Sequence, residues 1–181
     1  MDALEIFPGQ GLGPLRLGIP PEALEGTLTR LRIDWSPAPV SIWAERQAET
    51  DAPGLITGRY GDERSFFLVQ YQNGQAVEIG VDRLLDETLP VLWEGLPLFR
   101  LPAEEVVAAL SRKSPVLCDH PDTDLGTDYR FPALGLRLWR ERAFHPKLLQ
   151  DPDYRRDMAE VLEKETRYRY FQLAAVYPPK K

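Results

Sequence analysis

One pattern occurs twice in this sequence, 82 residues apart, and it constrains the fold more than any other feature. Written G-x6-P-x-E-x-[LV]-x3-L-x-R, it begins at Gly13 and again at Gly95. In each copy a proline suits the opening turn of a helix, and apolar residues follow at helical spacing. An internal repeat of this kind indicates a structural unit that the fold uses more than once.

The clearest local signal is a β-hairpin over residues 66–82. Apolar residues alternate on both sides of Asn73 and Gly74, a pair that readily takes the positive φ angles of a type I′ turn. A third helix is expected over residues 152–165, with Asp151 as its N-cap. Further strands are expected near residues 40–44, 135–140 and 168–177.

Together these elements predict an α+β fold. We expect a single domain, residues 1–181, built of two related halves, residues 1–94 and 95–181. Each half would hold a helix and an antiparallel sheet, and the two sheets could be separate or one continuous sheet. In the second half, the helix of residues 152–165 would be inserted between the two strands that correspond to the hairpin.

Charge and cysteine content limit the possible functions. The 181 residues include 28 acidic and 22 basic side chains, a net charge of −6, which argues against nucleic-acid binding. A single cysteine, Cys118, cannot form an internal disulfide and fits a reducing cytosol. No signal peptide is visible, and no apolar run approaches the roughly 20 residues of a membrane helix. We therefore expect a cytoplasmic protein that is not attached to a membrane.

Three glycines near the N-terminus, Gly9, Gly11 and Gly13, invite comparison with a phosphate-binding loop. A dinucleotide fingerprint needs a third glycine at a fixed spacing and a helix directly after it. That glycine is missing, and Pro14 and an apolar segment separate the triplet from the helix. The stretch is therefore expected to be a turn, a short extended segment and then a helix, with no cofactor bound.

Residues 118–128, called the acidic loop below, are the candidate site for a metal ion. Asp122, Asp124 and Asp128 follow one another with the alternate spacing of calcium ligands. An EF-hand would also need a glutamate at its twelfth position, where Ala133 stands, and a zinc site would need more Cys and His ligands. Aspartate, proline and glycine are also the residues of an exposed turn, so both interpretations stay open.

Nucleophilic catalysis finds little support. The two histidines, His120 and His145, each precede a proline, and no G-x-S-x-G motif is present. Cys118 and His120 are too close in sequence to be a typical pair, and Cys118 is expected to be a small buried residue. The arginines and tyrosines of residues 164–177 could stack on RNA, but their alternation favours a strand. No catalytic residue is assigned.

The stretch LRLGIPPEALEGTL, residues 15–28, resembles the opening of SmpA/OmlA-like and β-lactamase-inhibitor-protein-like repeats. The pattern L-x-L-G-M-[ST]-x-E-E-V-x-x-L-L is matched by six residues: Leu15, Leu17, Gly18, Glu22, Leu24 and Leu28. The later stretches LPAEEVVAAL and LGLRLWRE resemble small bacterial cytoplasmic proteins, some of which are immunity proteins to secreted toxins. These resemblances imply an α+β scaffold that binds proteins, and they carry over no catalytic residue.

The sequence therefore predicts a non-enzymatic protein-binding module, of the immunity type, with a basic toxin domain as its partner. Residues 1–136 carry 21 acidic and 11 basic side chains, and this acidic excess would attract such a partner. One alternative is a metal-dependent enzyme or small-ligand-binding protein with its site near residues 118–128. Another is a homo-oligomeric structural protein.

Overall fold

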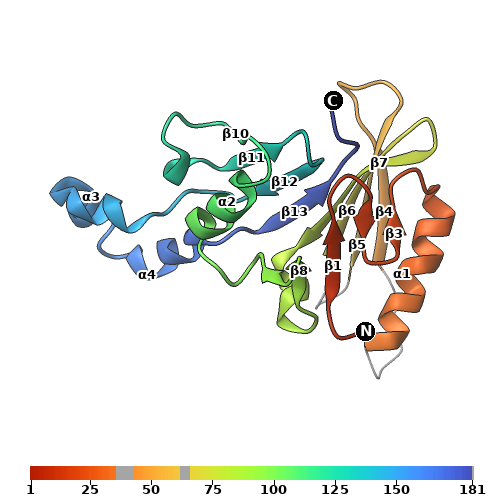
Figure 1. Cartoon of the computed structure of the whole chain (residues 1–181), viewed down its shortest axis with the longest axis horizontal. Coiled ribbons are helices and arrows are strands. Elements are labelled where there is room, and N and C mark those ends of the chain that lie inside the picture. The colour runs from red at the N-terminus through yellow and green to blue at the C-terminus, as the bar shows by residue number, and fades with distance from the viewer. Residues whose placement is uncertain (36–42, 62–65, 181) are drawn as a thin grey trace.

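The computed structural model describes residues 1–35, 43–61 and 66–180 and shows an α+β protein with two β-sheets (Figure 1). The larger sheet is antiparallel throughout, with the strand order β10-β11-β12-β13-β7-β6-β5-β4. Its strands are β4 (Trp43–Ala48), β5 (Leu55–Gly61), β6 (Phe66–Gln72), β7 (Gln75–Asp82), β10 (Leu117–Cys118), β11 (Asp128–Phe131), β12 (Leu136–Trp139) and β13 (Leu173–Val176).

The smaller sheet has the order β3-β2-β1-β8-β9 and includes one parallel pair, β1 with β8. Its strands are β1 (Leu4–Phe7), β2 (Gly11–Leu12), β3 (Leu15–Arg16), β8 (Val91–Trp93) and β9 (Leu96–Pro97). The helices are α1 (Pro21–Trp35), α2 (Ala103–Ser111), α3 (Pro152–Asp157) and α4 (Leu162–Glu165). Four 3-10 segments are η1 (Arg83–Glu87), η2 (Thr123–Leu125), η3 (Pro146–Gln150) and η4 (Thr166–Arg169). Within the described ranges, no helix is long and apolar enough to cross a membrane.

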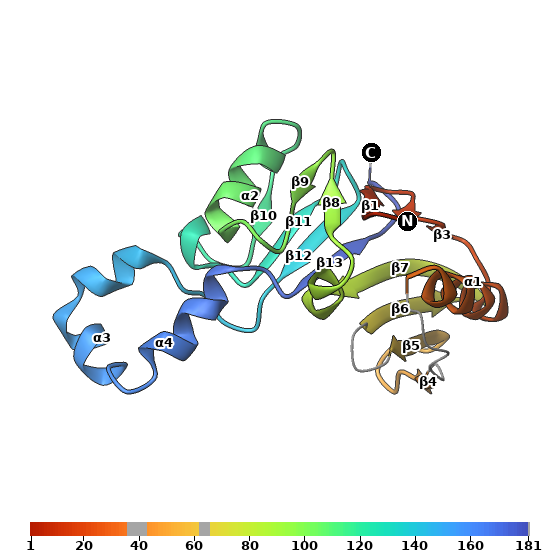
Figure 2. The same cartoon turned by 90° about the horizontal axis from the view of Figure 1, so that it is seen from below.

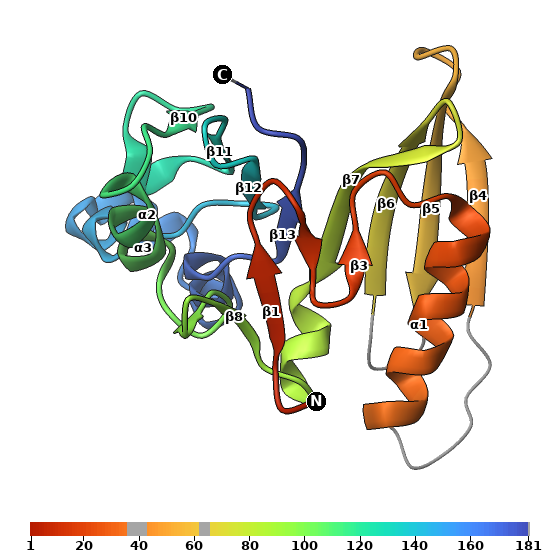
Figure 3. The ribbon, with the colours of Figure 1, turned by 45° about the vertical axis from the view of Figure 1, so that its right-hand side comes forward.

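One hydrophobic core lies between the larger sheet and the layer that covers it. Figures 2 and 3 show α1, the smaller sheet and α2 on the same side of the larger sheet. Alternate residues of the strands face this layer, so that Val69, Ile79, Val176 and Leu136 form one buried row across four neighbouring strands. The core is therefore continuous across the sheet.

The predicted hairpin is confirmed as β6 and β7, whose turn residues Asn73 and Gly74 have φ angles of 52° and 75°. Pairing of β13 with β7, in which Ala174 lies opposite Val81, joins the strands of both halves of the chain into one continuous sheet. The expected β12 is present as well, and it pairs directly with β13.

The repeat itself stays a prediction, and the structure adds two observations on it. Helix α2 begins at Ala103, 82 residues after α1 begins at Pro21. Gly13 and Gly95 both have positive φ, 51° and 79°, and each lies between two short paired strands.

Three expected elements differ in extent. The helix expected over residues 152–165 is two short helices, α3 and α4, separated by turns; Asp151 does cap α3, since its side chain accepts from the backbone N–H of Asp153. No residue of 152–164 is buried, so packing does not stabilise a longer helix. The strand expected over residues 168–177 begins only at Leu173, because the Tyr168 carbonyl bonds to a buried arginine instead of to a strand. Of the strand expected at residues 40–44, residues 40–42 lie outside the described ranges, and β4 begins at Trp43.

Candidate functional site

A buried arginine, Arg140, holds the acidic loop in place. The alternation of β12 directs Leu136, Leu138 and then Arg140 toward the core, and the Arg140 side chain is only 1% exposed. Its Nε donates to the carbonyl oxygen of Gly126 at 2.8 Å, and its Nη2 donates to that of Asp124 at 2.8 Å. One side chain thus holds the backbone of the acidic loop at two points.

The environment of Arg140 is aromatic and neutral. Within the described ranges no carboxylate lies within 4 Å of its guanidinium, which lies instead over the rings of Tyr129 and Phe171, at 5.8 and 6.0 Å from their centroids. Burial raises the pKa of Tyr129 to about 12, against the opposing effect of Arg140. The Tyr129 hydroxyl therefore stays protonated at neutral pH, accepts from Arg140 Nη2 at 3.1 Å and donates to the carbonyl oxygen of Thr123.

Two of the predicted metal ligands converge on a lysine. Lys147 Nζ lies 2.6 Å from Oδ2 of Asp122 and 2.7 Å from Oδ2 of Asp124. Hydrogen bonding to Lys147 lowers the pKa of Asp122, and the two carboxylates raise the pKa of Lys147. The ammonium group therefore occupies the position that a cation between these aspartates would take.

A histidine extends this group of charges toward α2. His145 Nδ1 accepts from the backbone N–H of Lys147 at 3.1 Å, so the proton of a neutral His145 ring belongs on Nε2. That Nε2 lies 3.8 Å from Oδ2 of Asp124 and 4.0 Å from Oε1 of Glu104. Glu104, in the first turn of α2, also accepts from Arg169 Nε at 2.9 Å. We call these six residues the ionic cluster: Glu104, Asp122, Asp124, His145, Lys147 and Arg169.

The third predicted ligand, Asp128, lies elsewhere. It is on β11, where Arg137 of β12 donates to both of its carboxylate oxygens at 2.9 Å. Among the residues that the structure describes, no group of three or more His, Cys, Asp or Glu side chains is placed to hold a metal ion. Metal binding by Asp122, Asp124 and Asp128 therefore stays a prediction.

The remaining polar residues of the acidic loop support its own backbone. Asp119 accepts from the backbone N–H of Thr127 at 2.8 Å, and His120 Nδ1 accepts from the N–H of Asp122 at 3.0 Å. Cys118 is half-buried, not fully buried as the sequence suggested, because it lies on the edge strand β10. Burial raises the pKa of the Cys118 thiol, which disfavours the thiolate that a nucleophile requires.

The sequence did not identify the partners that complete this site. Lys147, Glu104 and Arg169 come from η3, α2 and η4, and nothing local in the sequence indicates that they meet. Arg140 could have been found, because it continues the inward alternation of Leu136 and Leu138. In the ionic cluster each carboxylate already faces a lysine or an arginine. The cluster as it stands therefore stabilises the loop and offers no unpaired carboxylate as a base.

Residues 146–165, called the arm, project from the body of the protein. Figures 1 and 2 show α3 and α4 at the end of the molecule opposite α1. No side chain from residue 146 to residue 164 is fully buried. The arm nevertheless carries six apolar or aromatic residues, of which Val161 is 39% exposed and the others are half-buried: Leu148, Leu149, Tyr154, Met158, Val161 and Leu162.

Comparison with known proteins finds no counterpart, since no family model, no curated protein and no solved structure matches the chain.

Proposed function

We propose that this protein is a non-enzymatic protein-binding module and that its arm contacts the partner. The observation that carries the proposal is the arm's apolar side chains, which the described part of the chain covers only in part. Apolar groups gathered on a projecting segment are typical of interaction surfaces, since burying them on a partner removes them from water. Helices as short as α3 and α4 gain little stability by themselves, so such contacts would also stabilise the arm.

Charge supports a basic partner. Residues 1–136 have 21 acidic and 11 basic side chains, and the arm has six acidic and four basic ones. A basic domain would be attracted to this chain over distance, and its association would be faster at low salt. The specific form of the proposal is an immunity-type protein that binds and blocks a basic toxin domain.

A second candidate function rests on His145, whose Nε2 lies between the carboxylates of Glu104 and Asp124. A histidine with two acidic neighbours can transfer protons, and this would suit an enzyme or small-ligand-binding protein with its site beside residues 118–128. The ion pairs that these carboxylates already form, with Arg169 and Lys147, favour the binding module. A homo-oligomer, with the arm covered by a second copy, is the third possibility.

The proposal is tested by isolating the complex and then disrupting the arm. The tagged chain is recovered at native abundance from its source organism, and the protein that co-purifies is identified, produced separately and titrated against the chain by calorimetry. Replacing Val161 and Leu162 by serine should raise the dissociation constant about tenfold or more, as expected when apolar anchors are removed from an interface. Ala159→Ser, at an exposed position of the same arm, is the matched control and should leave the affinity unchanged.

Two results would count against the proposal. Recovery of the chain alone would exclude a stable partner under those conditions, and light scattering would then show whether it is a monomer or a homo-oligomer. Equal affinity of the serine variant and of wild type would remove the arm from the interface.

A further inference from the structure

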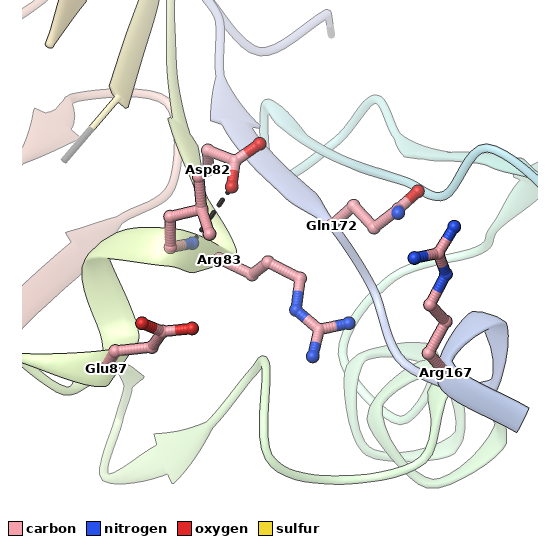
Figure 4. A pocket seen from close by; sticks show the side chains of 6 residues that line it. Asp82, Arg83, Glu87, Arg167 and Gln172 are labelled. Atoms are coloured by element: carbon pink, nitrogen blue, oxygen red, sulfur yellow. Dashed lines mark hydrogen bonds between the residues drawn. The ribbon is translucent and has the colours of Figure 1, made fainter. Parts of the chain in front are cut away.

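A depression of about 360 Å³ lies where the end of β7 and the start of η1 meet the residues that precede β13. It is lined by six residues, shown in Figure 4: Asp82, Arg83, Leu84, Glu87, Arg167 and Gln172. A second depression of about 320 Å³ shares Arg83 and Glu87 with it and continues to Phe99 and Arg100.

The pairing of β7 with β13 creates this site. Asp82 lies opposite Leu173 at the end of the ladder, and the backbone N–H of Arg83 donates to the carbonyl oxygen of Gln172 at 2.8 Å. The start of η1 is thereby held against the residues that precede β13. Side chains that are about 85 residues apart in sequence face one space for that reason.

Donor groups of Arg83, Arg167 and Gln172 line this space together with two carboxylates, Asp82 and Glu87. In the described part of the chain, the Glu87 carboxylate forms no ion pair with an arginine that lines either depression, whereas Asp86 pairs with Arg100. Figure 4 shows the Arg83 guanidinium extending into the space between Glu87 and Arg167, and the Arg167 guanidinium beside the Gln172 side chain. The Gln172 Oε1 atom accepts from the backbone N–H of Glu141 at 2.6 Å, which leaves the amide NH₂ as the outward group.

Neither arginine has an acidic partner in the described part of the chain. No carboxylate there lies within 4 Å of Arg83 or Arg167, whereas Arg100, Arg137 and Arg169 each pair with one. Asp82 is occupied in capping η1, since its carboxylate accepts from the Leu84 N–H at 2.9 Å. Two guanidinium groups that face one volume repel each other, and an anion between them removes that repulsion.

We propose that this depression binds the oxyanion of a small molecule, a carboxylate or a phosphate. Both groups present paired oxygens that match the planar donor fork of arginine. Arg83 would supply one fork, and Arg167, whose Nη2 already donates to the Tyr168 hydroxyl at 2.6 Å, would supply its other N–H groups. Gln172 adds a neutral donor. The neighbouring depression at Phe99 and Arg100 gives room for the remainder of the ligand, so a molecule larger than a bare ion fits the site.

The site is tested by titrating the purified full-length chain at low ionic strength with inorganic phosphate and, separately, with succinate. Calorimetry should show saturable binding of one ligand per chain, and Tm should rise by about 5 °C when the ligand is present at 100 times its Kd. Binding of phosphate alone, of succinate alone or of both supports the proposal and identifies the class of oxyanion. No saturable binding of either would overturn it.

Variants locate the binding. Arg83→Gln and Arg167→Gln should each raise Kd about tenfold, because each removes one charge-assisted contact. Arg155→Gln, an exposed arginine of the arm, is the control for loss of one positive charge and should bind as wild type does. An equal rise in Kd in the control variant would mean that the ligand is held by general charge attraction, and this would overturn the proposal. Urea midpoints of all three variants show whether each is folded, and the binding measured here does not depend on a protein partner.

Discussion

Arg140 and Tyr168, 28 residues apart in sequence, are joined by a hydrogen bond of 2.9 Å from Arg140 Nη1 to the Tyr168 carbonyl oxygen. The same Nη1 also donates, at 3.5 Å, to the carbonyl oxygen of Phe144. Phe144 and Tyr168 flank the arm, so one buried guanidinium fixes the points at which the arm leaves and rejoins the body. Through Gly126 and Asp124 the same group fixes the acidic loop.

The first prediction is that Arg140→Met destabilises the protein by about 3 kcal/mol, since several buried carbonyl oxygens lose their donor and each costs about 1–3 kcal/mol when left unpaired. Urea unfolding measures the loss. Protease cleavage within the arm should also become faster than in wild type. Arg140→Lys keeps the charge but not the planar fork, so its stability should lie between that of wild type and that of Arg140→Met.

Arg130→Met serves as the control, because Arg130 is exposed on the neighbouring strand and its removal is expected to change stability by no more than about 0.5 kcal/mol. If Arg140→Met proved as stable as this control, the Arg140 guanidinium would not be what holds the acidic loop and the ends of the arm in place.

The second prediction concerns Lys147 and the metal hypothesis for the acidic loop. With Lys147 in place, Ca²⁺ should leave Tm unchanged, because the ammonium group already neutralises Asp122 and Asp124. Lys147→Met leaves these two carboxylates facing each other without a cation, and Ca²⁺ at millimolar concentration should then raise the Tm of the variant. Thermal unfolding with and without Ca²⁺ measures both effects.

A rise in the Tm of the wild-type chain with Ca²⁺ would contradict this prediction. That result, together with loss of the effect in an Asp128→Asn variant, would establish the site that the spacing of the three aspartates suggested. A Ca²⁺ effect that persists without Asp128 would instead place the ion at Asp122 and Asp124 alone.

The sequence predicts what depends on neighbouring residues and misses what depends on distant ones. Asn73 and Gly74 specify their turn locally, and the proline at position 21 marks the start of α1 for the same reason. The ionic cluster could not be predicted, because Glu104 of α2 comes near His145 and Arg169 only in the folded chain. The depression that Arg83 and Gln172 line likewise forms only when β7 pairs with β13. No short sequence motif encodes that pairing.

The metal hypothesis shows that residue spacing alone does not predict where side chains point. The alternate spacing of Asp122, Asp124 and Asp128 is visible in the sequence, but the direction of each carboxylate is not. Asp128 begins a strand, where pairing with Arg137 directs it to the face of the sheet away from the core. Asp122 and Asp124 belong to a short 3-10 turn that directs them to Lys147.

The third prediction is a pH dependence of stability caused by Glu78. Burial raises the pKa of Glu78, and Arg137, whose Nη1 lies 3.6 Å from its carboxylate, opposes this only in part. The folded state therefore binds a proton that the unfolded state has already lost, so Glu78 lowers the stability as pH rises above its unfolded pKa of about 4.3. Glu78→Gln should remove this effect, so that the variant gains stability relative to wild type between pH 4 and the higher folded pKa.

Urea midpoints of both proteins, taken at intervals across that pH range, measure the difference. Arg137→Gln removes the opposing charge and should extend the loss of stability to higher pH. A constant difference between wild type and Glu78→Gln at every pH would show that Glu78 titrates alike in both states.

The last prediction compares two glycines with similar backbone angles but different surroundings. Gly74 and Gly135 have φ angles of 75° and 71°, which are unfavourable for any residue with a Cβ atom. A Cβ at Gly74 would meet no atom within 4 Å, whereas one at Gly135 would lie 2.1 Å from the carbonyl oxygen of Tyr177. Gly74→Ala should therefore cost about 1 kcal/mol, the backbone effect alone. Gly135→Ala adds a clash with the backbone directly after β13, and should cost about 3 kcal/mol or more. Urea unfolding of the two variants under one set of conditions measures both losses, and equal losses would mean that the chain after β13 moves aside without cost.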